Sequence, residues 1–358
     1  MDRTILHCDC NSFYASVETL LDPTLADGPT AVCGDPESRH GIILAKNEKA
    51  KAFGVQTAET IWQAKRKCPD LRLVAPHRSE YVKFSRKCNE LYLQYTDLVD
   101  PFGIDESFLD VTGSMHLFGS GEHIADELRR RMREEVGLTI SVGVSFNRAF
   151  AKLGSDYKKP DGTTIFSREN FKQRVWTLPA NTLLYVGKRA SDRLNRLGVR
   201  TIGELAACDP AFIHSILGKN GDLLLRYARG EDDEPVRSFY AEREVKSVGN
   251  SMTFAHNLLG ADECRMGITA LCDNVGRRLR KRGMVCQTVQ LGIRDPEFHN
   301  RSRQVTLERP TNSTRTLIDL SMHAAARARG RWTSRCACCR SRLPICCRKS
   351  VVRAAFAV

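Results

Sequence analysis

The chain has 358 residues, of which 42% are hydrophobic, and its formal net charge is +13. This length is enough for two or more hydrophobic cores. No stretch approaches the ~20 apolar residues of a membrane span, and charged residues stand too near the N-terminus for a secretory signal. We therefore expect a cytoplasmic protein with no membrane partner, whose 14 cysteines are reduced thiols.

The positive charge is concentrated in the C-terminal third of the chain. Residues 322–358 hold nine Lys or Arg and no acid, residues 237–321 carry a net charge of +5, and residues 1–236 carry −1. Only the part after residue 236 is therefore a basic surface of the kind that binds nucleic acid.

The first half of the chain alternates strands and helices. Residues 1–10 form a predicted strand that ends at Asp9, and residues 11–21 have the spacing of an amphipathic helix. The following elements are strands at 32–44, 71–74, 98–102 and 138–144, and helices at 47–53, 58–68, 80–95 and 121–137. This order is typical of an α+β layer.

Two adjacent acids, Asp105 and Glu106, stand between apolar residues in the stretch 101–111. Burying two carboxylates is costly unless a cation or hydrogen bonds compensate. Neighbours on a regular strand point to opposite faces, so we expect a bend or bulge here, for which Gly103 is suited. Together with Asp9, the pair supplies the carboxylates that two Mg²⁺ ions need for phosphoryl transfer. A turn with two solvated acids is the alternative.

After residue 166 the pattern becomes helical. Residues 186–205 resemble a helix-hairpin-helix, in which Gly187 lets backbone N–H groups approach a phosphate beside Lys188 and Arg189. Tyr185 stands where such hairpins usually carry a first glycine, and a plain helical hairpin is the alternative. Residues 230–235 (GEDDEP) predict a polar linker and a domain boundary.

The C-terminal part combines a predicted helix at 264–282, rich in basic residues at its end, with strands at 285–293 and 304–307. The density of arginines at this helix end favours a phosphate-facing surface. From residue 322 the composition changes to Arg, Ala and Cys. Two origins stay open, an out-of-frame reading of a GC-rich gene and a natural basic arm. With the first origin, we expect the last strand and helix of this domain to be missing and the domain to be loose.

These motifs together resemble those of the Y-family (DinB/UmuC-like) DNA polymerases, of the DNA polymerase IV type. The order and spacing of the segments carry the likeness over roughly residues 4–321, and the segments are 7–18, 45–55, 104–112, 141–156, 159–162 and 246–249.

The resemblance implies an α+β right-hand polymerase with five parts and a tail. These are a ferredoxin-like palm at 1–10 and 78–167, small fingers at 11–77, a helix-hairpin-helix thumb at 168–236, a linker at 237–244, an incomplete α/β little-finger domain at 245–321, and an aberrant tail at 322–358.

The resemblance also implies the chemistry: template-directed addition of dNTPs to a primer 3′-hydroxyl, with low fidelity and tolerance of damaged templates. Asp9 and Asp105 would bridge two Mg²⁺ ions, Glu106 would hold the primer-side ion, and Cys10 would add its backbone carbonyl. The implied nucleotide-binding residues are Ser12, Phe13, Tyr14 as steric gate, Lys51 and Lys159, and the implied DNA-binding residues are Gly187, Lys188, Arg189, Lys246 and Ser247.

Two residues depart from the pattern of the resembled family. Lys51 stands in place of an arginine, and Glu48 stands in place of a tyrosine. A lysine fixes an anion less well than an arginine because it lacks a planar fork of donors. Lys46 and Lys49 are candidates to compensate for that acid.

The sequence is also compatible with two other functions. A nucleotide cyclase on a similar palm would use the same carboxylates without DNA, and an impaired polymerase homologue would bind DNA without synthesis. The expected partners are primer–template DNA and dNTPs. A sliding clamp is a further partner of this type of polymerase, although the C-terminus shows no clamp-binding peptide.

Overall fold

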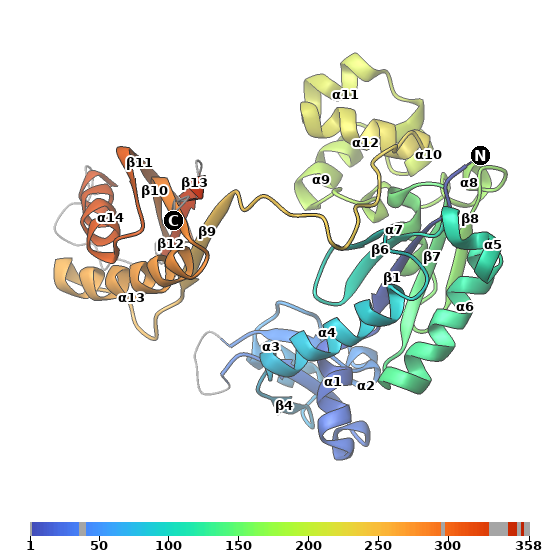
Figure 1. Cartoon of the computed structure of the whole chain (residues 1–358), viewed down its shortest axis with the longest axis horizontal. Coiled ribbons are helices and arrows are strands. Elements are labelled where there is room, and N and C mark those ends of the chain that lie inside the picture. Colours follow the sequence, from blue (N-terminus) through green and yellow to red (C-terminus); the bar gives the residue numbers. More distant parts are fainter. Residues whose placement is uncertain (1, 36–40, 295–297, 329–342, 349–351, 354–358) are drawn as a thin grey trace, which may run out of the picture. The chain divides into compact units, whose positions relative to one another are not determined.

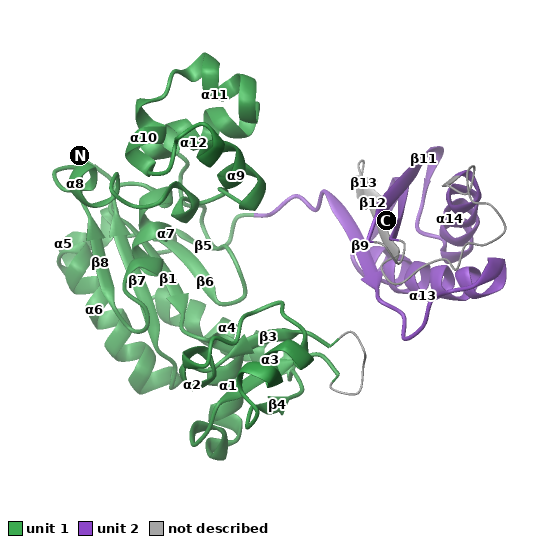
Figure 2. Cartoon of the chain, turned by 180° about the vertical axis from the view of Figure 1, so that it is seen from behind, with its two compact units in different colours: residues 1–37, 41–241 green, residues 38–40, 242–358 purple. Residues whose placement is uncertain are grey.

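The computed structural model describes residues 2–35, 41–294, 298–328, 343–348 and 352–353. It divides into two compact units, residues 1–37 with 41–241, and residues 38–40 with 242–358 (Figures 1 and 2). The division falls inside the segment 237–244 that the sequence predicts to be a linker. Each unit is described by itself below.

The first unit contains a five-stranded sheet with the order β5-β6-β1-β7-β8. Its central strand, β1, is antiparallel to both β6 and β7, and it is buried along its whole length. The strands are β1 (Ile5–Cys10), β5 (Val99–Pro101), β6 (Glu106–Asp110), β7 (Ile140–Ser145) and β8 (Thr163–Phe166).

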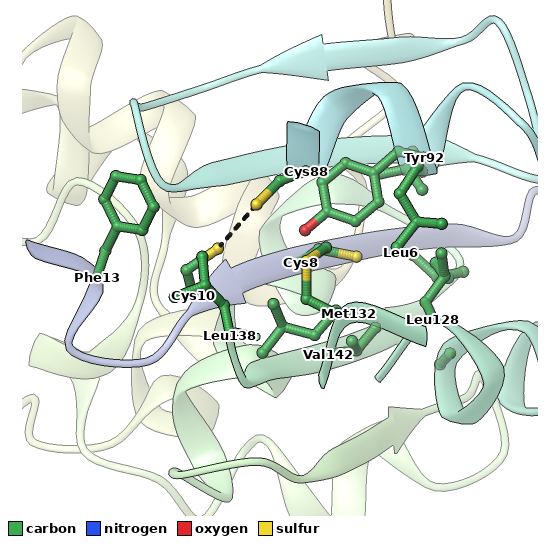
Figure 3. Packing of buried hydrophobic residues seen from close by; sticks show 14 of the residues in the cluster. Leu6, Cys8, Cys10, Phe13, Cys88, Tyr92, Leu128, Met132, Leu138 and Val142 are labelled. Atoms are coloured by element: carbon green, nitrogen blue, oxygen red, sulfur yellow. Dashed lines mark hydrogen bonds between the residues drawn. The ribbon is translucent and has the colours of Figure 1, made fainter. Parts of the chain in front are cut away.

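The two faces of this sheet are covered by different helices. Leu6, Cys8 and Cys10 of β1 point into a core shared with α4 and α6 (Figure 3). The alternate residues of β1 face α7, where Ile5 packs against Ala151. The helices of this layer are α4 (Arg78–Tyr92), α5 (Met115–Phe118), α6 (Gly121–Arg131), which continues as a π-helical turn (Met132–Val136), and α7 (Arg148–Tyr157).

Helix α7 lies unusually close to the sheet because glycines face each other there. A Cβ atom on Gly143 of β7 would stand 1.9 Å from the carbonyl oxygen of Ala151, and a Cβ on Gly154 would stand 2.9 Å from the Cα of Gly143. Only glycine fits at these positions. This contact sets the polar side chains of α7 against β1.

A smaller three-stranded sheet, with the order β3-β2-β4, follows the first helix. Its core is separate from that of the larger sheet. Its elements are α1 (Phe13–Leu21), β2 (Thr30–Cys33), β3 (Ile43–Lys46), α2 (Glu48–Ala52), α3 (Ile61–Lys67) and β4 (Arg72–Val74).

The remainder of the first unit is helical and packs on the start of α7 through a shared apolar core. Its helices are α8 (Phe171–Arg174), α9 (Lys188–Arg196), α10 (Ile202–Ala207), α11 (Pro210–Leu217) and α12 (Lys219–Arg229).

The predicted linker at 230–235 is not a linker but part of the first unit. Asp232 is buried and accepts a hydrogen bond from the backbone N–H of Ala149 at 3.1 Å, at the beginning of α7. Arg148 donates to the Pro235 carbonyl at 3.0 Å, and Val236 is buried against the sheet. The prediction was wrong because the acid caps a helix, a use that the local sequence does not reveal.

The second unit is a sheet with the order β11-β10-β12-β9, covered by two helices that pack together on it. Its elements are β9 (Ser247–Met252), α13 (Gly260–Lys281), β10 (Met284–Arg294), β11 (Asn300–Thr311), α14 (Thr314–Ala328), β12 (Leu343–Arg348) and β13 (Val352–Arg353), which pairs with β10.

Part of the basic end of α13 is used inside the second unit. Arg278 donates to the Gly249 carbonyl at 2.7 Å, and Arg280 donates to the Asn312 carbonyl, also at 2.7 Å. The sequence favoured a phosphate-facing role for the arginines of this helix end. These two instead join the helix to neighbouring backbone.

The expectation that the last strand and helix are missing was wrong. Helix α14 continues to Ala328, and Ala324 and Ala325 are buried in the core of the unit. Strand β12, at 343–348, pairs with both β10 and β9. Alanine is the best helix former, so a run without an obvious apolar period still continues the helix. Most of the tail lies outside the described residues, and its origin stays a prediction.

Candidate active site

A tight hairpin between β5 and β6 presents the acid pair. The backbone N–H groups of Phe102 and Gly103 donate to the Glu106 carbonyl at 2.9 and 3.1 Å. Strand β6 begins at Glu106, so Asp105 lies in the turn and is freed from the alternation of the strand. The predicted bend is confirmed.

The pairing of β1 with β6 brings the third acid to this hairpin. Asp9 is the direct cross-strand partner of Glu106, and the Cys10 N–H donates to the Asp105 carbonyl at 2.9 Å. Three acids from segments about a hundred residues apart therefore meet at the end of β1.

Two lysines contact these carboxylates. The Lys152 ammonium lies 2.9 Å from Oδ2 of Asp9 and 2.8 Å from Oε2 of Glu106. Lys159 lies 3.0 Å from Oδ1 of Asp9. The sequence named Lys159 as a triphosphate ligand, and the structure places it at the acids.

The acids differ in their affinity for protons. Burial, together with repulsion from Asp9 and Glu106, raises the pKa of Asp105 to about 6. Burial also acts to raise the pKa of Glu106, but the contact with His7 and the charge of Lys152 outweigh it and lower that pKa to about 2. Of the two adjacent acids, Asp105 and Glu106, Asp105 is therefore the one whose negative charge is less well compensated.

The raised pKa of Asp105 predicts a stability effect. With a pKa near 6 in the folded protein and about 3.9 in the unfolded chain, the ionised carboxylate opposes folding, fully above pH ~6 and not at all below ~4. We expect Asp105→Asn to raise the free energy of unfolding at pH 8 by on the order of 2 kcal/mol. Urea unfolding in EDTA at pH 8 and pH 4 measures this difference. An equal gain at both pH values would contradict the assignment.

His7 is a site residue that the sequence reasoning missed. It is fully buried, its Nδ1 lies 2.8 Å from the Ser155 hydroxyl, and its Nε2 lies 3.4 Å from Oε2 of Glu106. Burial lowers its pKa. The Ser155 hydroxyl donates to the Lys152 carbonyl, so the neutral ring donates through Nδ1, and its Nε2 has no hydrogen-bond partner among the described residues. Its position two residues before Asp9, on the same face of a strand, was the available signal.

The donor set fits a divalent cation. Ligand-capable atoms of His7, Asp9 and Glu106 lie within 4.8 Å of one another. Asp105 lines the same pocket as Asp9. Carboxylate oxygens are the ligands that Mg²⁺ prefers, and a cation would relieve the repulsion that raises the pKa of Asp105.

A pocket of about 410 Å³ opens beside the acids. Ser12 is in the left-handed conformation (φ 49°) and turns the chain from β1 into α1, whose first backbone N–H groups have no partner within the helix. The lining includes the predicted residues Asp9, Cys10, Ser12, Phe13, Tyr14, Lys51, Asp105 and Lys159. The structure therefore gathers all the predicted nucleotide-binding residues around one cavity.

Tyr14 is half-buried at this cavity, and its ring stacks on Tyr81 with 4.2 Å between centroids and 13° between planes. The Tyr81 hydroxyl donates to the buried Glu18. Phe13 is only 2% exposed and belongs to the core. Tyr14 is therefore the more exposed of the two aromatic residues that line the cavity, and Tyr81 supports its ring.

Glu48 places a negative charge in this cavity. Its carboxylate lies 3.2 Å from the Lys51 ammonium and accepts from the Ser12 hydroxyl at 3.3 Å. Lys46 also lines the cavity, where it donates to the Thr57 hydroxyl at 3.2 Å. Lys49 donates to the Asp27 carbonyl at 2.9 Å. Of the two candidates for compensation, only Lys46 lies at the cavity.

The predicted DNA-binding residues form two separate groups. Gly187 is the N-cap of α9, with open space around it, and Lys188 and Arg189 follow it, exposed, in the first unit. Lys246 and Ser247 are exposed at the start of β9 in the second unit. Each group therefore lies within its own unit.

Tyr185 adopts the backbone that a glycine would give at this hairpin. Its φ is +68°, and its ring stacks on that of Tyr227. A positive φ is uncommon for residues other than glycine. Tyr185 therefore holds a backbone conformation that a glycine reaches more easily.

The fold is that of the Y-family polymerases. The solved structure of a Y-family DNA polymerase chimera, Dbh-Dpo4(243-245)-Dbh, matches with a TM-score of 0.86 at 21% identity and covers 97% of this chain and 98% of its own. DinB from Sulfolobus solfataricus matches with a TM-score of 0.62 at 20% identity, covering 98% of this chain and 99% of its own.

The sequence comparisons define the family more closely. Residues 8–156 match the model of the impB/mucB/samB family, and residues 245–343 match that of its C-terminal domain. DNA polymerase IV of Acetivibrio thermocellus is 48% identical over 314 residues, which is 88% of this chain and 79% of that protein. DNA polymerase IV of Moorella thermoacetica is 36% identical over 332 residues, 92% of this chain and 83% of that protein. The chain belongs to the impB/mucB/samB family, the DinB-type Y-family polymerases.

No helix among the described residues combines the length and apolar character needed to cross a membrane.

Proposed function

We propose that the chain is a DNA-directed DNA polymerase that adds dNTPs to a primer 3′-hydroxyl and copies damaged templates. The observation that carries this proposal is the meeting of Asp9, Asp105 and Glu106 at the end of β1, where Asp9 and Asp105 line one cavity. The 48% identity to a DNA polymerase IV over most of both chains supports it.

The metal ligands of the proposed site are Asp9, Asp105, Glu106 and the backbone carbonyl of Cys10. Two Mg²⁺ ions bound there would supply the positive charge that lowers the pKa of the primer hydroxyl and neutralises the triphosphate. The β1–β6 register and the hairpin fix the positions of the three carboxylates. The two ions would therefore bind at one defined place.

The cavity residues bind and orient the nucleotide. The free N–H groups at the start of α1 are suited to phosphate oxygens. Lys51 and Lys159 add positive charge at its rim, and Tyr14 faces the sugar. A single lysine fixes an anion less firmly than an arginine, so the backbone of Ser12 to Tyr14 carries more of the orientation.

The two exposed basic groups described above are the proposed contacts to the DNA backbone, Gly187 to Arg189 in the first unit and Lys246 with Ser247 in the second. Backbone contacts of this kind position DNA without reading its sequence. This suits an enzyme that copies any template. A cytoplasmic location remains an expectation from the sequence, and a sliding-clamp partner remains an expectation of the resemblance.

Primer extension tests the proposed function. With Mg²⁺, dNTPs and a primer–template, we expect synthesis that depends on the template and continues past a damaged base. Product formation from a nucleotide without DNA would favour a cyclase-like enzyme. DNA binding with no extension would favour an impaired homologue.

Glu48 gives a second test of the cavity. Its carboxylate offsets Lys51 and engages Ser12, and it repels a triphosphate. We expect Glu48→Gln to lower the KM for dNTP by roughly fivefold, as the loss of a partly exposed charge interaction of ~1 kcal/mol allows. Steady-state kinetics with Glu80→Gln as a control measures it. An unchanged or higher KM would show that Glu48 does not face the triphosphate.

A further inference from the structure

Both carboxylate oxygens of Asp9 are bound by ammonium groups. Lys152 lies 2.9 Å from Oδ2, and Lys159 lies 3.0 Å from Oδ1. Lys152 also lies 2.8 Å from Oε2 of Glu106. The atoms that the proposed function assigns to cations thus already have positive partners within the chain.

A fourth acid, Asp156, binds the same two lysines from the other side. Its Oδ2 lies 3.3 Å from the Lys152 ammonium, and its Oδ1 lies 2.8 Å from that of Lys159. Its side chain is 46% exposed, against 12% for Asp9. Asp156 is therefore a carboxylate outside the proposed ligand set that is in contact with both lysines.

Secondary structure explains this arrangement. Lys152 and Asp156 are one helical turn apart on α7, and Lys159 follows the end of that helix. The glycine contact between α7 and β7 sets this turn against β1. The three side chains are thereby held on one edge of the acid cluster.

A divalent cation and an ammonium group compete for the same oxygens. Oxygen ligands lie roughly 2.0–2.1 Å from Mg²⁺. A carboxylate oxygen that binds the cation at this distance must release its ammonium partner or share it with the cation. A released ammonium group in a partly buried site needs another anion nearby. Asp156 offers one without requiring either lysine to leave the cluster.

We propose that Lys152, Lys159 and Asp156 form a cation-exchange device, in which the lysines hold the ligand carboxylates together until divalent cations bind and then shift onto Asp156. This inference rests on the proposed function, since it concerns the same cation site.

The device predicts opposite effects for two substitutions on the same helix. Lys152→Met removes the competitor and should tighten binding of a divalent cation by about tenfold. Asp156→Asn removes the acceptor, leaves both lysines on Asp9, and should weaken binding by about tenfold. A general loss of folding would weaken binding in both variants.

The experiment is titration of the full chain with Mn²⁺, without DNA or nucleotide, read by the electron paramagnetic resonance signal of the free ion. Lys158→Met is the matched control, since this neighbouring lysine is exposed, and we expect its affinity to equal that of the wild type. Lys152→Arg keeps the charge, so wild-type affinity should return. In EDTA, the melting temperature of Lys152→Met should lie below that of the wild type, and the melting temperature of Lys158→Met should equal it.

The Asp9→Asn variant distinguishes failure of the proposed cation site from failure of the cation-exchange device alone. If the wild type shows no Mn²⁺ binding that Asp9→Asn removes, the proposed site fails, and the device fails with it. If Asp9→Asn removes the binding but the Lys152 and Asp156 variants bind like Lys158→Met, the device alone is overturned. Opposite changes in the two variants support it.

Discussion

Asp105→Ala is expected to lower the rate of primer extension by roughly a thousandfold or more. The reason is that loss of a shared metal ligand removes several kcal/mol of charge stabilisation from the transition state. Single-turnover extension of a labelled primer in Mg²⁺ measures the effect. The matched control is Asp97→Ala, an exposed acid of the same unit, which should extend like the wild type.

Loss of folding does not explain such a result if the variant is as stable as the wild type. Because the pKa of Asp105 is raised by burial and by repulsion from Asp9 and Glu106, its removal should not lower the melting temperature in EDTA. Extension by Asp105→Ala within about tenfold of the wild-type rate would remove this residue from the catalytic set.

Tyr14→Ala is expected to raise the incorporation of ribonucleotides relative to deoxynucleotides by roughly a hundredfold, the range that steric exclusion in a shaped pocket provides. The ring lines the cavity and rests on Tyr81, and in the proposed function it would exclude a ribose 2′-hydroxyl. The ratio of kcat/KM for UTP and dTTP on one template measures the change.

Tyr14→Phe is the control for this experiment. It keeps the ring and removes only the hydroxyl, so sugar discrimination should stay near that of the wild type. If Tyr14→Ala discriminates as well as Tyr14→Phe, the ring is a packing residue and the steric gate lies elsewhere.

The acid pair could be predicted from the sequence because its setting is unusual. Carboxylates beside Phe102, Ile104 and Phe108 need a partner, and the alternation of a strand demands a bend at Asp105. The register of Asp9 against Glu106 was not predictable, because the pairing of strands about a hundred residues apart is decided by the whole sheet.

The residues around the acids were harder to predict. Lys152 and Asp156 stand in an ordinary helical pattern, where charged residues at this spacing usually form a solvated pair. Their role depends on the close approach of α7 to β7 at Gly143. His7 looks like a core residue of a strand until the position of Glu106 is known.

Two errors share one physical cause. The acids at 230–235 looked like a solvated linker, and the alanines after Met322 looked like a run without a core. Asp232 caps α7, and Ala324 packs in the second unit. In both places tertiary contacts give a buried role to residues whose local pattern shows none.

The most direct test of the three-carboxylate site is a crystal structure of the chain with primer–template, a non-hydrolysable dNTP and Mn²⁺, with the ions located by anomalous scattering. We expect two peaks about 4 Å apart, with carboxylate oxygens of Asp9 and Asp105 bound to both and Glu106 bound to one. Manganese bound to the nucleotide but to neither aspartate would contradict it.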